Sequence, residues 1–205
     1  MKPLLELHYL PSVGYLSAVA RAGGVRLEAC EHFQKGSFRN RCRLASSQGA
    51  FELSLPLEGG KNRQCPIRED RLAYDENWPL QHWRTLETCY RSAPFWLYYA
   101  DHFGPIFLKK KWELLWDFNL ALFEKMRQLF DIEAVIEFSE KYEAVAEADF
   151  RGQFSPKKTE LPPGFVSKKY PQLFEDRLGF LPNLSALDLL FCLGGKQGRA
   201  VLLNP

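Results

Sequence analysis

The chain has 205 residues, of which 46% are hydrophobic and 14% aromatic, and its formal net charge is +2. This composition supplies enough apolar side chains for a folded core and excludes disorder as the main state. A charge so close to balance argues against a protein that coats nucleic acid, so any anion binding must come from local clustering. The length predicts one domain over residues 1–205.

The cysteines and the apolar runs bear on where the protein acts. Five cysteines are scattered along the chain without a CxxC pair, which is atypical of a disulfide framework and favours a reducing cytoplasm. The N-terminus is too short and too interrupted for a signal peptide. No uncharged apolar run approaches the roughly 20 residues that span a bilayer. We therefore expect a cytoplasmic protein without a membrane segment.

The first thirty residues predict a strand–helix–strand unit. Residues 4–9 are mostly apolar, Ser12 opens a segment with helical spacing, and Gly23 ends it before a second apolar run at residues 25–30. Short connections favour a parallel pair, which brings the carboxyl ends of both strands to one edge of the sheet. We expect an α/β fold with a mixed sheet that begins with this unit and a helical C-terminal half.

His8 lies near the end of the first predicted strand, and Glu31 directly follows the second. Both side chains are therefore expected at the carboxyl edge of the sheet, which is where open α/β sheets usually bind their ligands.

A basic segment follows this unit. Arg39, Arg41 and Arg43 alternate with single residues between them, so on a strand all three would share one face. Together with Lys35 and Asn40, they suit phosphate, carboxylate or a nucleotide-linked donor, because guanidinium binds such oxyanions in bidentate fashion. The alternative is a solvated strand edge, where cations discourage aggregation.

The rest of the chain predicts a hairpin and then mainly helices. His82 and Thr85 lie three residues apart on the first of these helices, so they can act together. The predicted elements are a hairpin at residues 39–55, a strand at 66–73, a helix from Trp78, a turn at Gly104-Pro105, a helix at 112–130, a strand at 132–138, a loop at 151–167 and a short helix after Ser185.

Signatures of common cofactors and metals are missing. The sequence has no GxxxxGK[ST] loop, no GxGxxG after a strand, no GxSxG elbow and no HExxH. Cys30, His32 and Cys42 match no established zinc spacing. We predict neither a cofactor nor a metal site.

Several motifs, taken in order, resemble the WbqC-like protein family. They are YLPSVGY at residues 9–15, KGSFRNRC at 35–42, NWPLQHWRT at 77–85, YRSAPF at 90–95, Phe118-Asn119 and LSALDLL at 184–190. Where relatives often carry Gln-Pro before the Tyr-Leu-Pro motif, this chain has Glu6-Leu7. The family takes its name from bacterial surface-polysaccharide gene clusters. The resemblance therefore implies a role in sugar or sugar-nucleotide modification, with acyl or aminoacyl transfer as candidate reactions.

These observations give two hypotheses. In the first, the protein is an enzyme of bacterial surface-glycan or sugar-nucleotide modification, in which Lys35, Arg39 and Arg41 hold an anionic donor such as a sugar nucleotide or acyl donor. His82 would be the general base, oriented by Glu31. Further substrate contacts would come from Asn40, Thr85, Asn119 and His8. In the second hypothesis the protein is a non-catalytic module that binds nucleic acid or an acidic protein through the same basic segment.

Overall fold

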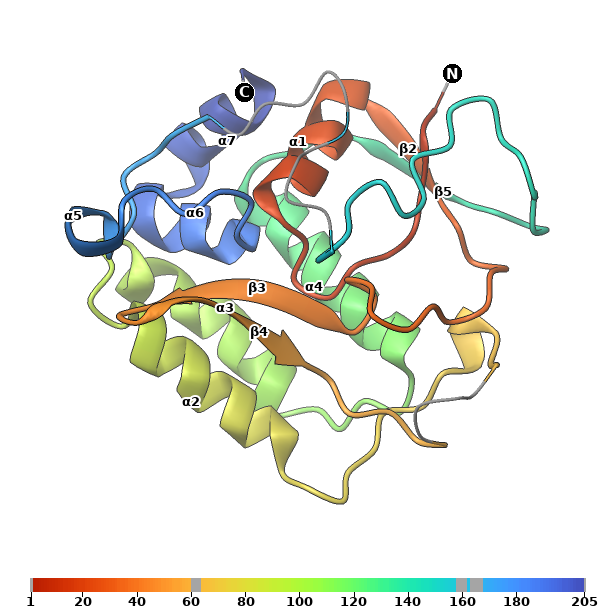
Figure 1. The fold of residues 1–205 in the computed structure, drawn as a ribbon, viewed down its shortest axis with the longest axis horizontal. Coiled ribbons are helices and arrows are strands. Elements are labelled where there is room, and N and C mark those ends of the chain that lie inside the picture. Colours follow the sequence, from red (N-terminus) through yellow and green to blue (C-terminus); the bar gives the residue numbers. More distant parts are fainter. Residues whose placement is uncertain (1, 60–63, 158–161, 163–167, 205) are drawn as a thin grey trace.

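The computed structural model describes residues 2–59, 64–157, 162 and 168–204. Three parallel strands form one sheet, β1 (Leu4–Leu5), β2 (Gly24–Leu27) and β5 (Val135–Phe138). Their order is β1-β2-β5, so that β2 is central (Figure 1). The described residues thus confirm an α/β fold that begins with a parallel pair.

Helix α1 (Val13–Ala22) connects the first two strands. Ser12 caps it, because its Oγ accepts a hydrogen bond from the backbone N–H of Tyr15. Gly23 ends it with a φ of +63°, which favours glycine. Both ends agree with the predicted helix. Strand β1 is shorter than predicted, and the chain turns between it and α1 at Leu10, whose φ of +43° is uncommon for a leucine.

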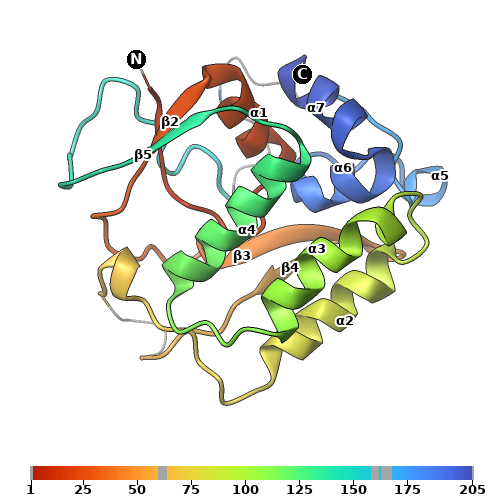
Figure 2. The same cartoon turned by 180° about the vertical axis from the view of Figure 1, so that it is seen from behind.

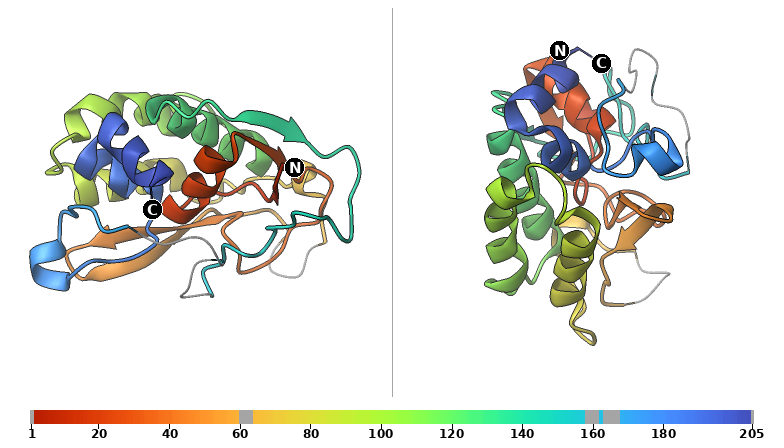
Figure 3. Two further views of the ribbon diagram at one scale, coloured as in Figure 1. Left: turned by 90° about the horizontal axis from the view of Figure 1, so that it is seen from above. Right: turned by 90° about the vertical axis from the view of Figure 1, so that its left-hand side faces the viewer.

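The predicted hairpin is present as β3 (Arg41–Ser46) and β4 (Gly49–Ser54), which pair antiparallel as a separate two-stranded sheet. It lies on the opposite side of the molecule from helices α3 (Trp96–Leu108) and α4 (Leu115–Leu129) (Figure 3). The backbone N–H of Ala45 donates to the Tyr90 hydroxyl, and the N–H of Ser185 donates to the Arg43 carbonyl. These bonds attach the hairpin to helix α2 (Trp78–Tyr90) and to the start of helix α6 (Ala186–Leu193).

Helices dominate the second half of the chain, as predicted. Helix α2 packs on α3, α3 packs on α4 and α6, and α1 packs on α7 (Figure 2). Their bounds are α2 (Trp78–Tyr90), α3 (Trp96–Leu108), α4 (Leu115–Leu129), α5 (Glu175–Leu178), α6 (Ala186–Leu193) and α7 (Gly195–Leu203). In the part of the chain that the structure describes, none of the helices is both long and apolar enough to cross a membrane.

Two predicted elements are wrong. Residues 66–73 form no strand, because Ile67–Glu69 make a 3-10 turn in which the N–H of Glu69 donates to the Pro66 carbonyl. Gly104-Pro105 is no turn either and lies inside α3. Proline removes one backbone hydrogen bond of the helix there, but the helix continues past it, since the Pro105 carbonyl accepts from the N–H of Lys109. The predicted loop at 151–167 lies partly outside the described residues.

Candidate functional site: a pocket at the carboxyl edge of the parallel sheet

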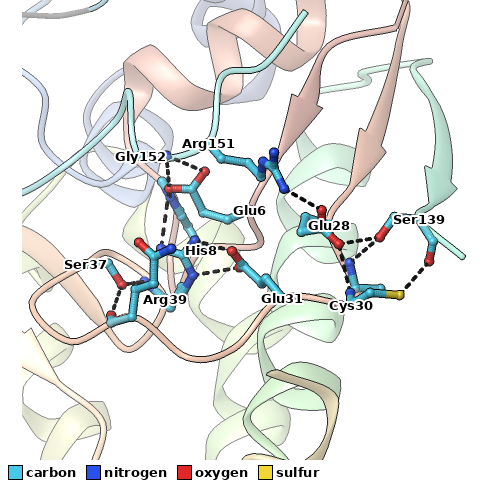
Figure 4. Close-up of polar contacts among 12 residues, drawn as sticks. Glu6, His8, Glu28, Cys30, Glu31, Ser37, Arg39, Ser139, Arg151 and Gly152 are labelled. Carbon is cyan, nitrogen blue, oxygen red and sulfur yellow. Dashed lines mark hydrogen bonds and ion pairs between the residues drawn. The ribbon is translucent and has the colours of Figure 1, made fainter. Parts of the chain in front are cut away.

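Polar side chains follow the carboxyl ends of all three parallel strands. Glu6 and His8 follow β1, Glu28 and Glu31 follow β2, and Ser139 follows β5 (Figure 4). Glu6, His8 and Glu28 are fully buried, and Glu31 is 2% exposed. The structure therefore brings His8 and Glu31 to one edge of the sheet, as the sequence predicted.

Arg39 joins these side chains into a buried network. Its Nε and Nη2 donate to the two carboxylate oxygens of Glu31 at 2.7 and 2.5 Å. Its Nη1 lies 3.7 Å from Oε1 of Glu6, which is 3.2 Å from Nε2 of His8. The backbone N–H of Gly152 donates to both Glu6 oxygens (Figure 4). Glu6 thus connects the loop after β5 to the network.

Burial and charge together set the ionisation of this network. Burial lowers the pKa of His8, so the imidazole stays neutral although it lies beside Glu6. Burial opposes the ionisation of Glu6, but the hydrogen bond with His8 and the positive charge of Arg39 outweigh it and hold the Glu6 pKa below its usual value. Burial raises the pKa of Glu31 despite the Arg39 guanidinium. Such a raised carboxyl pKa suits a group that takes up and releases protons.

A second polar group lies beside the first. Arg151 donates to Glu28 at 2.8 Å and also pairs with Asp149. The Ser139 hydroxyl donates to Glu28 at 2.6 Å, and the Cys30 thiol contacts the Ser139 carbonyl at 3.4 Å (Figure 4). These bonds attach the chain after β5 to the chain after β2.

A pocket of about 400 Å³ opens at this edge. Glu31 belongs both to its wall and to the buried network. The wall is held in place by the backbone, since the N–H of Phe33 donates to the Cys65 carbonyl and the N–H of Ile67 donates to the Glu31 carbonyl. The lining residues are Cys30, Glu31, His32, Phe33, Gln34, Gln64 and Tyr142.

Two other surface hollows have similar volumes. One of about 430 Å³ lies around Tyr74 and Trp112, and another of about 380 Å³ lies around Arg26 and Glu137. In each of them charged side chains of the lining pair with one another, Arg71 with Glu113 in the first hollow and Arg26 with Glu143 in the second. The pocket at the carboxyl edge differs because its carboxylate continues into a buried network, so it is the better candidate site.

The basic segment does not form the predicted row. Arg39 precedes β3, is 1% exposed and is enclosed by carboxylates. Arg41 and Arg43 are two residues apart on β3, and Arg41 pairs with Glu52 at 3.0 Å. Lys35 is exposed. Arg39 therefore does not share a strand face with Arg41 and Arg43, because the strand begins at Arg41, two residues later than the predicted row requires.

Glu31 and His82, predicted to act together, have different partners. Glu31 binds Arg39, whereas Nδ1 of His82 lies 2.8 Å from the Tyr9 hydroxyl. Burial lowers the pKa of His82 to about 4, so its imidazole is neutral at pH 7. The Thr85 hydroxyl donates to the Gln81 carbonyl within α2.

The two predicted asparagines hold the backbone around Arg39. Nδ2 of Asn119 donates to the Arg39 carbonyl at 2.7 Å, and Nδ2 of Asn40 donates to the Leu55 carbonyl at 3.0 Å. Oδ1 of Asn119 is buried and has no hydrogen-bond partner among the described residues. Asn119 therefore positions the chain at Arg39.

Several site residues were missed from the sequence. Glu6 was noted only as a departure from the family pattern, and Arg151 and Tyr142 stand in segments without a recognised motif. A charged residue inside the apolar run at residues 4–9 was the available signal for Glu6, since such a charge requires a partner when buried. Tyr142 had no comparable signal, because its place depends on the path of the chain after β5.

Comparison with known proteins agrees with the motif analysis. The model of the WbqC-like protein family matches residues 7–154. The chain is 27% identical over 222 positions to a Mycobacterium tuberculosis protein named "Uncharacterized protein Rv1507c", with 94% of each chain covered. No solved structure matches the chain.

Proposed function

The chain belongs to the WbqC-like protein family, and we propose that it is an enzyme that modifies a sugar or sugar nucleotide of a bacterial surface glycan by acyl or aminoacyl transfer. The observation that carries this proposal is the pocket at the carboxyl edge, in which Glu31 joins the wall to the buried network. Its lining offers rings, amides and a carboxylate, which are groups that stack on sugar rings and bind hydroxyls. We place the enzyme in the cytoplasm, where its five free cysteines stay reduced.

Glu31 is the proposed acid–base group of the site. It lines the pocket, and Arg39 holds both of its oxygens, so the carboxylate presents a fixed geometry to a bound ligand. His82 packs against Tyr9 and Trp78 in the core. We therefore move the role of general base from His82 to Glu31.

The anionic part of a donor would lie against Lys35. This lysine is exposed and directly follows Gln34, which lines the pocket. The next residue, Gly36, has a φ of +73°, and a Cβ there would lie 3.5 Å from Nζ of Lys157. The ammonium group of Lys157 thus lies beside the loop that carries Lys35, and two lysines at one loop suit a phosphate.

The alternative of a module that binds nucleic acid or an acidic protein has less support. It requires a basic face, but the Arg39 guanidinium is buried against Glu31 and Glu6. Arg41 is paired with Glu52 on the surface. A ligand that enters a pocket fits these charges better than an extended polyanion does.

Ligand binding and turnover test the proposal. Nucleotide sugars and acyl thioesters are screened by thermal shift, because a ligand that binds the folded state raises the apparent stability. A nucleotide sugar and an acyl thioester that both bind are then incubated together with the protein, and the acylated sugar is detected by mass spectrometry. We expect the wild type and a Glu113→Gln control, altered in a surface ion pair, to form product. Glu31→Gln should form none. Equal turnover by Glu31→Gln would contradict the assignment.

A further inference from the structure

The side chains behind the pocket carry more carboxylates than cations. Among the described residues of the two groups, the guanidinium groups of Arg39 and Arg151 face three buried carboxylates, those of Glu6, Glu28 and Glu31, and Arg151 also pairs with the partly exposed Asp149. His8, which also contacts Glu6, is neutral because it is buried. The buried part of the network therefore holds one more carboxylate than it holds guanidinium groups, and a buried carboxylate of this kind favours a cationic partner.

Glu31 is the member of this network that can meet such a partner. Each carboxylate oxygen has two lone pairs, and Arg39 occupies one on each oxygen of Glu31. Glu31 is also the carboxylate of the network that lines the pocket, where 2% of its side chain is exposed, so a small donor in the pocket meets it at the wall. An ammonium group brings N–H donors together with a positive charge, whereas the O–H donor of a hydroxyl group carries no charge.

The rest of the lining suits the body of a sugar. The rings of Phe33 and Tyr142 supply apolar faces, and the amides of Gln34 and Gln64 can both donate to and accept from hydroxyl groups. The guanidinium of Arg151 lies 5.0 Å from the ring centre of Tyr142, which fixes this ring beside the network.

We infer that the pocket takes an amino sugar whose ammonium group lies against Glu31, and that this nitrogen is the acceptor of the acyl group. The inference rests on the proposed function and names its acceptor. Glu31 takes one proton from the ammonium group and later releases it to water. The amine nitrogen then attacks the carbonyl carbon of an acyl thioester, so that a C–N bond forms and the C–S bond breaks. The thiolate leaves with the electron pair and takes the second proton from nitrogen.

Three matched ligands test the inference on the wild-type chain by isothermal titration calorimetry. UDP-glucosamine carries the ammonium group, UDP-N-acetylglucosamine carries an uncharged amide, and UDP-glucose carries a hydroxyl at the same position. We expect UDP-glucosamine to bind about tenfold more tightly than either of the others, which is the ratio that one charged hydrogen bond supplies. Glu31→Gln should remove this preference, whereas Glu113→Gln should keep it.

The outcomes separate the inference from the proposed function. Equal binding of all three ligands overturns the amino-sugar inference and leaves sugar binding in place. Failure of all three to bind contradicts the proposed function as well. Because Glu31→Gln leaves Arg39 without its closest partner and can unfold the chain, the comparison of the three ligands on the wild type decides the question by itself.

Discussion

Arg39 binds both carboxylate oxygens of Glu31, at 2.7 and 2.5 Å, while its Nη1 lies 3.7 Å from Glu6. The most buried cation of the basic segment is therefore an internal group that holds an acid of the pocket wall. This relationship exchanges the roles expected from the sequence, in which arginine would bind the ligand and glutamate would orient a histidine. Here the glutamate belongs to the wall of the pocket, and the arginine holds both of its oxygens from the buried side.

Removal of Arg39 should destabilise the protein strongly. Arg39→Met keeps much of the side-chain volume but leaves Glu31 and Glu6 buried beside each other without a cation. Breaking one side of a buried ion pair costs about 3–5 kcal/mol, so the free energy of unfolding in urea should fall by about that amount.

Arg41→Gln is the matched control for Arg39→Met. Arg41 pairs with Glu52 where both side chains are about one third exposed, and surface pairs of this kind contribute about 0–1 kcal/mol. Similar losses of unfolding free energy in the two variants would show that Arg39 does not stabilise the buried network more than Arg41 stabilises its surface pair.

His82 should make the protein less stable in weak acid. Its pKa is about 4 in the folded chain and 6.5 when unperturbed. Between these values the unfolded state binds a proton that the folded state does not, so stability falls as the pH drops from about 6.5 to about 4. This shift corresponds to about 3 kcal/mol. Urea unfolding across this range should show a weaker pH dependence in His82→Gln than in the wild type, and parallel curves would contradict the assignment.

Asp188 should make the protein more stable in weak acid, which is the opposite of the effect of His82. It is fully buried and accepts from the Tyr170 hydroxyl, and burial raises its pKa from 3.8 to about 6. The folded state therefore binds a proton that the unfolded state releases, so this contribution to stability is lost as the pH rises from about 4 to about 6. The difference in unfolding free energy between wild type and Asp188→Asn should change by about 3 kcal/mol over that range. A constant difference would show that Asp188 titrates normally.

Gly195 marks a close approach of two helices. A Cβ at this position would lie 2.1 Å from the carbonyl oxygen of Leu129, the last residue of α4. Gly195→Ala should therefore lower the free energy of unfolding by about 1–3 kcal/mol, as overpacking does.

Gly104 inside α3 provides the control for Gly195. A Cβ there would make an ordinary contact of 3.4 Å with the ring of Trp83, and alanine is favoured over glycine in a helix by about 1 kcal/mol. Gly104→Ala should match or exceed the wild type in thermal unfolding. If Gly104→Ala lost as much stability as Gly195→Ala, the close approach at Gly195 would not be the cause of the loss there.

The ends of helices could be predicted from the sequence where residues close in the chain determine them. Ser12 and Gly23 mark the ends of α1, and Ser185 caps α6, because capping depends on residues within one turn. Gly104-Pro105 failed as a turn signal, because the packing of α3 overrides the local preference for a break.

The site was predictable only in part, because long-range pairing decides it. The strand–helix–strand pattern placed His8 and Glu31 at one edge, which the structure shows. It could not pair Glu31 with Arg39 rather than with His82, since the sequence does not say that Arg39 lies before the strand and points inward. Arg151 reaches Glu28 across 123 positions of the chain, a contact that no local pattern predicts.

The proposed function requires that a sugar ligand binds in the pocket at the carboxyl edge of the parallel sheet. Tyr142 lines this pocket and is 54% exposed, whereas Tyr98 is 71% exposed on α3. The most direct measurement is the affinity of UDP-glucosamine for Tyr142→Ala and Tyr98→Ala by isothermal titration calorimetry. We predict that Tyr142→Ala weakens binding about tenfold, because the loss of about 55 Å² of apolar contact costs about 1.4 kcal/mol at about 25 cal/mol per Å², and that Tyr98→Ala binds as the wild type does. Unchanged binding by Tyr142→Ala would contradict the claim.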